Sequence, residues 1–211
     1  MEQAEGSDLH QRRAHHWCEM AAEAKEPTQA EALLRTALEV SPSSVRARMA
    51  LAELHASKGQ VSDALDALLP LSESHAEALL LVAQPMATWA LGSSKSEQVK
   101  AVFERLYEQS QSADALEALG ILSGSADAAR EAYIEHLKRK PSMLVATKWI
   151  EGEKFEHEEF HPQVQKALDT AVQPLKRYRC GSCGFEAKRY FWQCPGCQSW
   201  DSYAYKRVEE L

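Results

Sequence analysis

The sequence predicts an all-α helical repeat solenoid followed by a small C-terminal β domain that binds a metal ion. Three observations carry this prediction: apolar residues recur at helical spacing, similar helix pairs recur about every thirty-four residues, and two CxxC pairs lie near the end of the chain. We expect a disordered N-terminus over residues 1–8, helical repeats over 9–174 and a metal-binding domain over 175–211.

The helical part is rich in Ala, Leu, Glu and Gln and contains no convincing alternation of apolar and polar residues. Pro and Gly divide it into segments of about 10 to 18 residues, a length at which helices joined by short turns stack antiparallel. The predicted helix pairs span residues 9–40, 44–71, 76–109, 112–139 and 142–172.

A short motif within these segments identifies the kind of repeat. A small residue followed one helical turn later by a bulky one recurs as Ala30-x3-Leu34, Ala64-x3-Leu68 and Ala129-x3-Tyr133. The small residue lets two helices approach closely, and the bulky one fills the gap beside it. The spacing is typical of tetratricopeptide repeats. The repeat between them is irregular, because Val99 stands where alanine is expected before Phe103, and an unrelated helical bundle is the alternative.

The C-terminal cysteines form two pairs separated by ten residues, namely Cys180, Cys183, Cys194 and Cys197. We call each CxxC pair with its turn a knuckle. Gly184 and Pro195-Gly196 supply the tight turns that the two knuckles need. Four thiolates make a closed tetrahedral site for one zinc or iron ion, as in rubredoxin-like and zinc-ribbon domains, with zinc favoured. Two disulfides or four free thiols are the alternatives, but four of the five cysteines lie within eighteen residues, which favours a metal. Cys18 stands alone in a helical pattern and is expected to be a small buried side chain.

Aromatic residues crowd the cysteine segment, and residues 185–192 begin with the alternation of a strand and end in an aromatic run. One face of this strand can cover the knuckles, so the other needs a second apolar surface. The linker over residues 173–176 reaches roughly 14 Å, so we predict docking on the last helix pair. The side chains expected to receive it are Trp149, Ile150, Phe155, Val164, Leu168 and Val172.

No phosphate-binding loop, metalloprotease motif or nucleophile elbow is present, so we expect no enzyme. The net charge is -7, and residues 1–174 carry 17 Lys and Arg against 27 Asp and Glu, which disfavours nucleic acid. The sequence shows no signal peptide and no membrane-spanning apolar run, which indicates a cytoplasmic protein. The acidic run over residues 151–159, with His157 and His161, is expected to be a solvated turn.

Repeat solenoids bind partner proteins on the concave surface lined by the first helix of each pair. The side chains expected to face a partner there are Arg12, His15, Glu19, Arg46, Met49 and Glu53. A nucleic-acid-binding zinc ribbon is one alternative function, and it would use Arg177, Arg179, Lys188 and Arg189. A general protein-interaction module is another alternative, and electron transfer through iron is a third.

The segments RCGSCGF, FWQCPGCQSW and KRKPSMLVATKW resemble the lipopolysaccharide assembly protein B family, and the likeness extends from about His15 onward. The resemblance implies the four cysteines as metal ligands and a non-enzymatic adaptor that restrains lipopolysaccharide synthesis. Such an adaptor brings the lipid A pathway deacetylase to a membrane-bound AAA+ protease on the cytoplasmic face of the inner membrane. Members of the family begin with a membrane-spanning helix and further repeats. We therefore expect this chain to be a C-terminal portion or a shortened relative, tethered only through a segment that it lacks.

Overall fold

The structure, a computed structural model, describes residues 2–154 and 158–211, with side chains from Leu9 onward. The first two helix pairs are α1 (Glu2–Glu23) with α2 (Pro27–Val40), and α3 (Val45–Ser57) with α4 (Val61–Leu68) and α5 (Leu71–Ser74). The third comprises the 3-10 helix η1 (Ala76–Val82), α6 (Ala83–Ala90) and α7 (Ser96–Ser110). The last two are α8 (Ala113–Ser123) with α9 (Ala126–Arg139), and α10 (Met143–Glu151) with η2 (Glu158–Phe160) and α11 (His161–Ala171).

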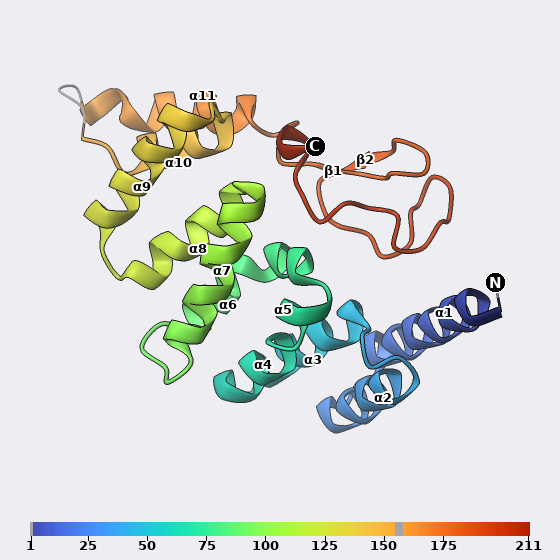
Figure 1. Cartoon of the computed structure of the whole chain (residues 1–211). Helices are drawn as coiled ribbons and strands as arrows, with labels where there is room; N and C mark the ends of the chain where they lie inside the picture. Colours follow the sequence, from blue (N-terminus) through green and yellow to red (C-terminus); the bar gives the residue numbers. More distant parts are fainter. Residues whose placement is uncertain (1, 155–157) are drawn as a thin grey trace.

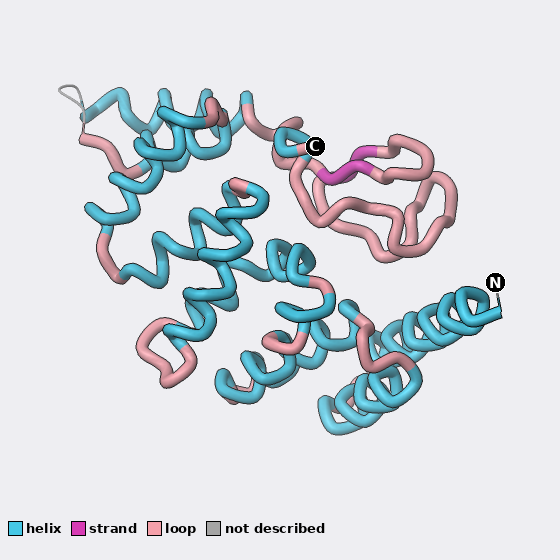
Figure 2. Tube along the Cα trace, in the orientation of Figure 1, coloured by secondary structure: helices cyan, strands magenta, loops and turns pink. Residues whose placement is uncertain are grey.

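These helices pack as successive hairpins (Figures 1 and 2). The first helices of neighbouring pairs also contact each other: α1 contacts α3, and α6 contacts α8. The helical repeat fold predicted from the sequence is confirmed. Along the described part of the chain, no helix combines the length and the apolar character that crossing a bilayer requires.

Serine side chains define where several of these helices begin. Ser44, Ser112 and Ser142 each precede a first helix of a pair, and each hydroxyl accepts a hydrogen bond from a backbone N–H of the first turn. Such a cap satisfies a donor that would otherwise have no partner inside the helix. Pro27 opens α2, where its missing N–H costs nothing.

Small residues bring the paired helices together, as the motif predicts. Ala64 and Leu68 are completely buried in the second pair. In the fourth pair, a Cβ added to Gly120 would lie 3.2 Å from the Cβ of Ala129, so glycine permits the close approach of α8 and α9. The irregular third repeat differs in starting with a 3-10 helix, yet Phe103 is still fully buried.

The N-terminus departs from the prediction. The described backbone is helical from Glu2, whereas the sequence predicts disorder over residues 1–8. Ala, Glu and Gln in this segment are good helix formers, so α1 extends back through it.

The C-terminal segment contains two short antiparallel strands, β1 (Tyr178–Arg179) and β2 (Glu186–Ala187), with Tyr178 opposite Ala187. β2 is much shorter than the strand expected over residues 185–192. The chain leaves the sheet after Ala187 and forms the second knuckle. Two isolated antiparallel bridges hold the segment that follows: Trp200 pairs with Gln193, and Tyr203 pairs with Cys180. We call the segment from Tyr178 to Tyr203 the ribbon.

The ribbon is docked on the helices, as predicted, but on a different surface. It lies between α1 and the last helix pairs (Figure 1). Its aromatic cluster packs against Leu81 of η1, while Trp192 packs against the core of the first four pairs. Of the residues predicted to receive it, Val172 is fully buried, Val164 is exposed and Phe155 lies outside the described residues. The surface used is thus the concave side, where the first helices supply apolar groups.

Candidate metal centre

The two knuckles have the same backbone construction. In the first, the N–H of Gly184 donates to the carbonyl of Cys180 over 2.9 Å; in the second, the N–H of Gln198 donates to the carbonyl of Cys194 over 2.8 Å. The amide of each first cysteine also donates to the residue five positions on. Each pair of thiols is therefore carried by an equivalent tight turn.

Each turn needs one residue in the left-handed region of backbone conformation. Gly184 supplies it with φ of 78°, and Gln198 supplies it in the second knuckle with φ of 61°. The sequence prediction assigned the second turn to Pro195-Gly196 and missed Gln198. Gly196 serves close packing instead, since a Cβ there would lie 3.4 Å from that of Phe185 and 3.6 Å from the sulfur of Cys183.

The four sulfur atoms lie within 4.8 Å of one another. Cys180 and Cys197 are 3.8 Å apart at Sγ, and Cys183 and Cys194 are 3.6 Å apart. A disulfide would need about 2.05 Å, whereas a tetrahedron with metal–sulfur distances of about 2.3 Å has edges of about 3.8 Å. The geometry fits one ion held by four thiolates. Among the described residues, no other group of His, Cys, Asp or Glu is gathered in this way.

The site is asymmetric in its exposure. Cys180 and Cys194, the first cysteine of each knuckle, are buried, while Cys183 and Cys197 face solvent. The Ser202 hydroxyl lies 3.2 Å from the sulfur of Cys180. Burial raises the pKa of Cys180, but its hydrogen bonds with Ser202 and with backbone N–H groups outweigh burial and lower that pKa to about 6. At Cys180 these contacts favour the thiolate that a metal requires. At Cys183 the backbone N–H of Phe185 lowers the pKa, but desolvation and the three neighbouring thiols outweigh it and raise that pKa.

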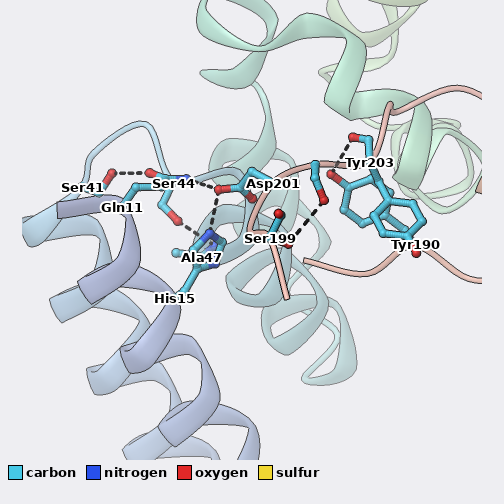
Figure 3. A network of polar contacts seen from close by, with 10 residues as sticks. Gln11, His15, Ser41, Ser44, Ala47, Tyr190, Ser199, Asp201 and Tyr203 are labelled. Atoms are coloured by element: carbon cyan, nitrogen blue, oxygen red, sulfur yellow. Dashed lines mark hydrogen bonds and ion pairs between the residues drawn. The ribbon is translucent and has the colours of Figure 1, made fainter. Parts of the chain in front are cut away.

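The segment that follows the second knuckle carries the ribbon to α1. Asp201 accepts from Gln11 over 3.4 Å and lies 2.8 Å from Nε2 of His15, as Figure 3 shows. The His15 ring stacks on Trp200, with centroids 4.4 Å apart. We call this contact of Gln11 and His15 with Trp200 and Asp201 the seam. Sequence reasoning missed it because the two sides lie 186 residues apart.

The residues predicted to face a partner divide into two groups. Arg46, Met49 and Glu53 line one cleft of about 450 Å³, which Tyr190 and Trp192 of the ribbon complete. Arg46 also pairs with Glu19 over 2.8 Å.

The other residues of that set lie outside the cleft lining. His15 is fully buried in the seam, and Arg12 is exposed on α1. Cys18 lines the cleft and is buried, as expected from the sequence, and burial raises its pKa to about 11, as befits an unreactive thiol.

Most of the basic residues proposed for the nucleic-acid alternative have partners in the ribbon. Arg179 pairs with Glu186 over 2.8 Å, and Arg177 lies 3.7 Å from the same carboxylate. The Arg189 guanidinium lies 4.7 Å from the ring centroid of Phe191. These contacts engage three of the four charges that the nucleic-acid alternative would need, and the fourth, Lys188, is exposed.

The acidic run behaves as a turn where it is described. Glu153 pairs with Arg130 over 2.6 Å, and Nε2 of His161 lies 3.1 Å from the carbonyl of Ile150. His157 lies outside the described residues.

Comparison with known proteins agrees with both parts of the chain. Residues 178–203 match the family described as rubredoxin metal binding domain, and residues 21–84 match tetratricopeptide repeat. The chain is similar to lipopolysaccharide assembly protein B of Escherichia coli strain K12, with 24% identity over 200 residues, or 90% of this chain and 51% of the relative. The protein of that name from Haemophilus influenzae is 24% identical over 196 residues. The chain thus spans about half the length of these relatives, and the resemblance expected from the sequence is confirmed.

Proposed function

We propose that this chain is a non-enzymatic adaptor that acts in the control of lipopolysaccharide assembly. One observation carries the proposal: repeats followed by a rubredoxin-type domain align, in that order, with relatives named for lipopolysaccharide assembly over 90% of the chain. Either part alone would indicate only a protein-interaction module or a metal site.

The partners that we propose are the lipid A pathway deacetylase and a membrane-bound AAA+ protease. The adaptor would bring the first to the second and so limit lipopolysaccharide synthesis. Its place would be the cytoplasmic side of the inner membrane. This assignment rests on the family resemblance, because the geometry alone does not select a partner.

We propose Cys180, Cys183, Cys194 and Cys197 as the ligands of one ion, zinc in preference to iron. Four sulfur ligands leave no open coordination position, so the ion would supply folding free energy, on the order of 10 kcal/mol, and no catalysis. The ribbon is too small to bury a core of its own, so its aromatic residues hold their places only with the knuckles closed.

The cleft between the ribbon and the first two repeats is the partner surface that we propose. It offers apolar groups such as Met49 and Trp192 beside the charged Arg46 and Glu53. Because one wall comes from the ribbon, partner binding would require a folded metal centre. Arg12, His15 and Glu19 would contribute through the position of α1.

Affinity capture from bacterial membranes tests the proposal. The intact chain should recover the deacetylase or the protease, identified by mass spectrometry, and Cys180→Ser with Cys194→Ser should recover neither. Lys188→Ala, an exposed change in the ribbon, is the matched control and should capture normally. Recovery of nucleic acid in place of either protein would contradict the adaptor role.

The cleft has its own test. Arg46→Glu combined with Glu53→Lys should weaken capture while helical circular dichroism stays unchanged. Glu39→Lys, an exposed change on α2, should alter neither. A loss of helicity in the double variant would mean that these residues are structural.

A further inference from the structure

The last residues of the chain lie across the N-termini of two helices that belong to successive repeats. Val208, Glu209 and Glu210 form a short 3-10 turn, η3 (Val208–Glu210), beyond the ribbon. We call residues 207–210 the tail. Its two glutamate side chains reach different helices.

Glu209 caps α10. Its carboxylate accepts from the backbone N–H of Met143 over 2.6 Å and from that of Leu144 over 3.3 Å, and the Ser142 hydroxyl donates to it over 2.8 Å. The first turn of α10 has no acidic residue of its own. A carboxylate at this end of a helix satisfies free N–H groups and interacts favourably with the helix dipole.

Glu210 makes the equivalent contact with α8. Its carboxylate accepts from the backbone N–H of Ala113 over 2.6 Å and from the Ser112 hydroxyl over 3.3 Å. Burial raises the pKa of Glu210, and the hydrogen bond from Ala113 opposes that shift. The carboxylate thus lies in a partly desolvated position at the N-terminus of α8.

Further contacts fix the tail between the linker and α8. Arg207 pairs with Asp114 over 3.0 Å, donates to the carbonyl of Lys176 over 3.0 Å and lies 4.6 Å from the ring centroid of Tyr178. The N–H of Val208 donates to the carbonyl of Arg177 over 2.8 Å. The tail thus touches the ribbon, the linker and two repeats within four residues.

We propose that the tail is an intramolecular clasp, in which Glu210 and Glu209 supply the N-terminal caps of α8 and α10 and so join the ribbon to the last two repeats as one unit. Each helix already has its serine cap, but that hydroxyl satisfies only one of the free donors of the first turn. The remaining donors named above are met by residues that lie 65 or more positions away. This clasp is a property of the chain itself, whatever protein the repeats bind.

Hydrogen exchange of the full chain, followed by mass spectrometry, tests the clasp. Glu209→Ala should accelerate exchange at the start of α10, and Glu210→Ala should accelerate it at the start of α8, each by about fivefold, the effect of losing one cap. Each variant should leave the other helix much less affected. Glu131→Ala, an exposed change on α9, should leave both helix starts unchanged.

A faster exchange confined to the helix that each glutamate caps distinguishes the clasp from a general stabilising effect of the tail. Unchanged exchange at both helix starts would overturn the proposal, and so would a uniform increase that includes α2 and α4. Glu209→Gln and Glu210→Gln provide a milder pair if the alanine variants fold poorly. They keep an acceptor oxygen and lose the charge, so they should give the same pattern at smaller amplitude.

Discussion

The imidazole of His15 lies almost parallel to the indole of Trp200, at an interplanar angle of 21°, and His15 is completely buried. Its Nε2 atom meets the carboxylate of Asp201, so one side chain of the first helix holds both an aromatic and a charged residue of the ribbon. The seam therefore rests largely on one histidine.

Replacing His15 should loosen the ribbon from α1. We expect His15→Ala to lower the free energy of unfolding by about 2 to 3 kcal/mol, since it leaves a cavity beneath Trp200 and removes the shorter of the two contacts to Asp201. Hydrogen exchange should rise in α1 and in residues 199–203. His10→Ala, at an exposed position on the same helix, should change stability by less than about 0.5 kcal/mol. Equal effects of the two changes would contradict this role.

The metal centre predicts a definite stoichiometry. Elemental analysis of chelator-washed protein should give about one zinc or iron per chain, because four thiolates satisfy one tetrahedral ion. Cys194→Ser should lose the ion, while Cys18→Ala should keep it because Cys18 lies outside the cluster. Four freely titratable ribbon thiols without bound metal would refute the site. A colourless protein would favour zinc over iron.

The knuckle turns should respond oppositely to substitution. Gly184→Ala should destabilise the ribbon by about 1 kcal/mol through backbone strain alone, since a Cβ there meets nothing within 4 Å. Gln198→Gly should be neutral or slightly stabilising, because it relieves a left-handed glutamine. Chelator-driven unfolding measured on both variants checks the pair. A destabilised Gln198→Gly would show that its side chain has a role of its own.

His136 should make stability dependent on pH. Burial lowers its pKa, nearby Lys140 lowers it further and Glu209 opposes the shift, while the Tyr107 hydroxyl lies 2.9 Å from Nδ1. Because the folded pKa lies below the unfolded value of about 6.5, the unfolded state binds the proton first as pH falls. The free energy of unfolding should therefore decrease below about pH 6.5, until the folded histidine is protonated as well.

Denaturant unfolding between pH 7.5 and 5.5 measures that dependence. His136→Gln removes the titrating group and should show a smaller decrease than the unsubstituted chain. His10→Gln, which removes an exposed imidazole, should behave like the unsubstituted chain. An unchanged slope in His136→Gln would contradict the prediction.

The sequence predicted what depends on local spacing. Helix pairs follow from apolar periodicity and breakers, and the gathering of four thiols follows from two CxxC turns. It did not predict Gln198, because nothing in the type of residue marks a left-handed glutamine. It also placed the ribbon on the last helix pair, since linker length limits reach without fixing direction.

Contacts between distant segments were beyond that reasoning. His15 was expected on a surface open to partners, and the structure buries it under Trp200 and Asp201. Nothing in the sequence pattern singles out Glu209 and Glu210. Their function as caps appears only when the helix starts of α8 and α10 are placed beside them.

The seam also imposes an order on events during synthesis. Asp201 is made 186 residues after His15, which takes roughly 10–40 s at ribosomal rates of about 5–20 residues per second. The helices of the first repeats can form early because their contacts are local. Until the ribbon emerges, however, Trp200 and Asp201 cannot cover His15 on α1. A nascent or prematurely terminated chain would thus leave this face of α1 uncovered, where chaperones or proteases could bind.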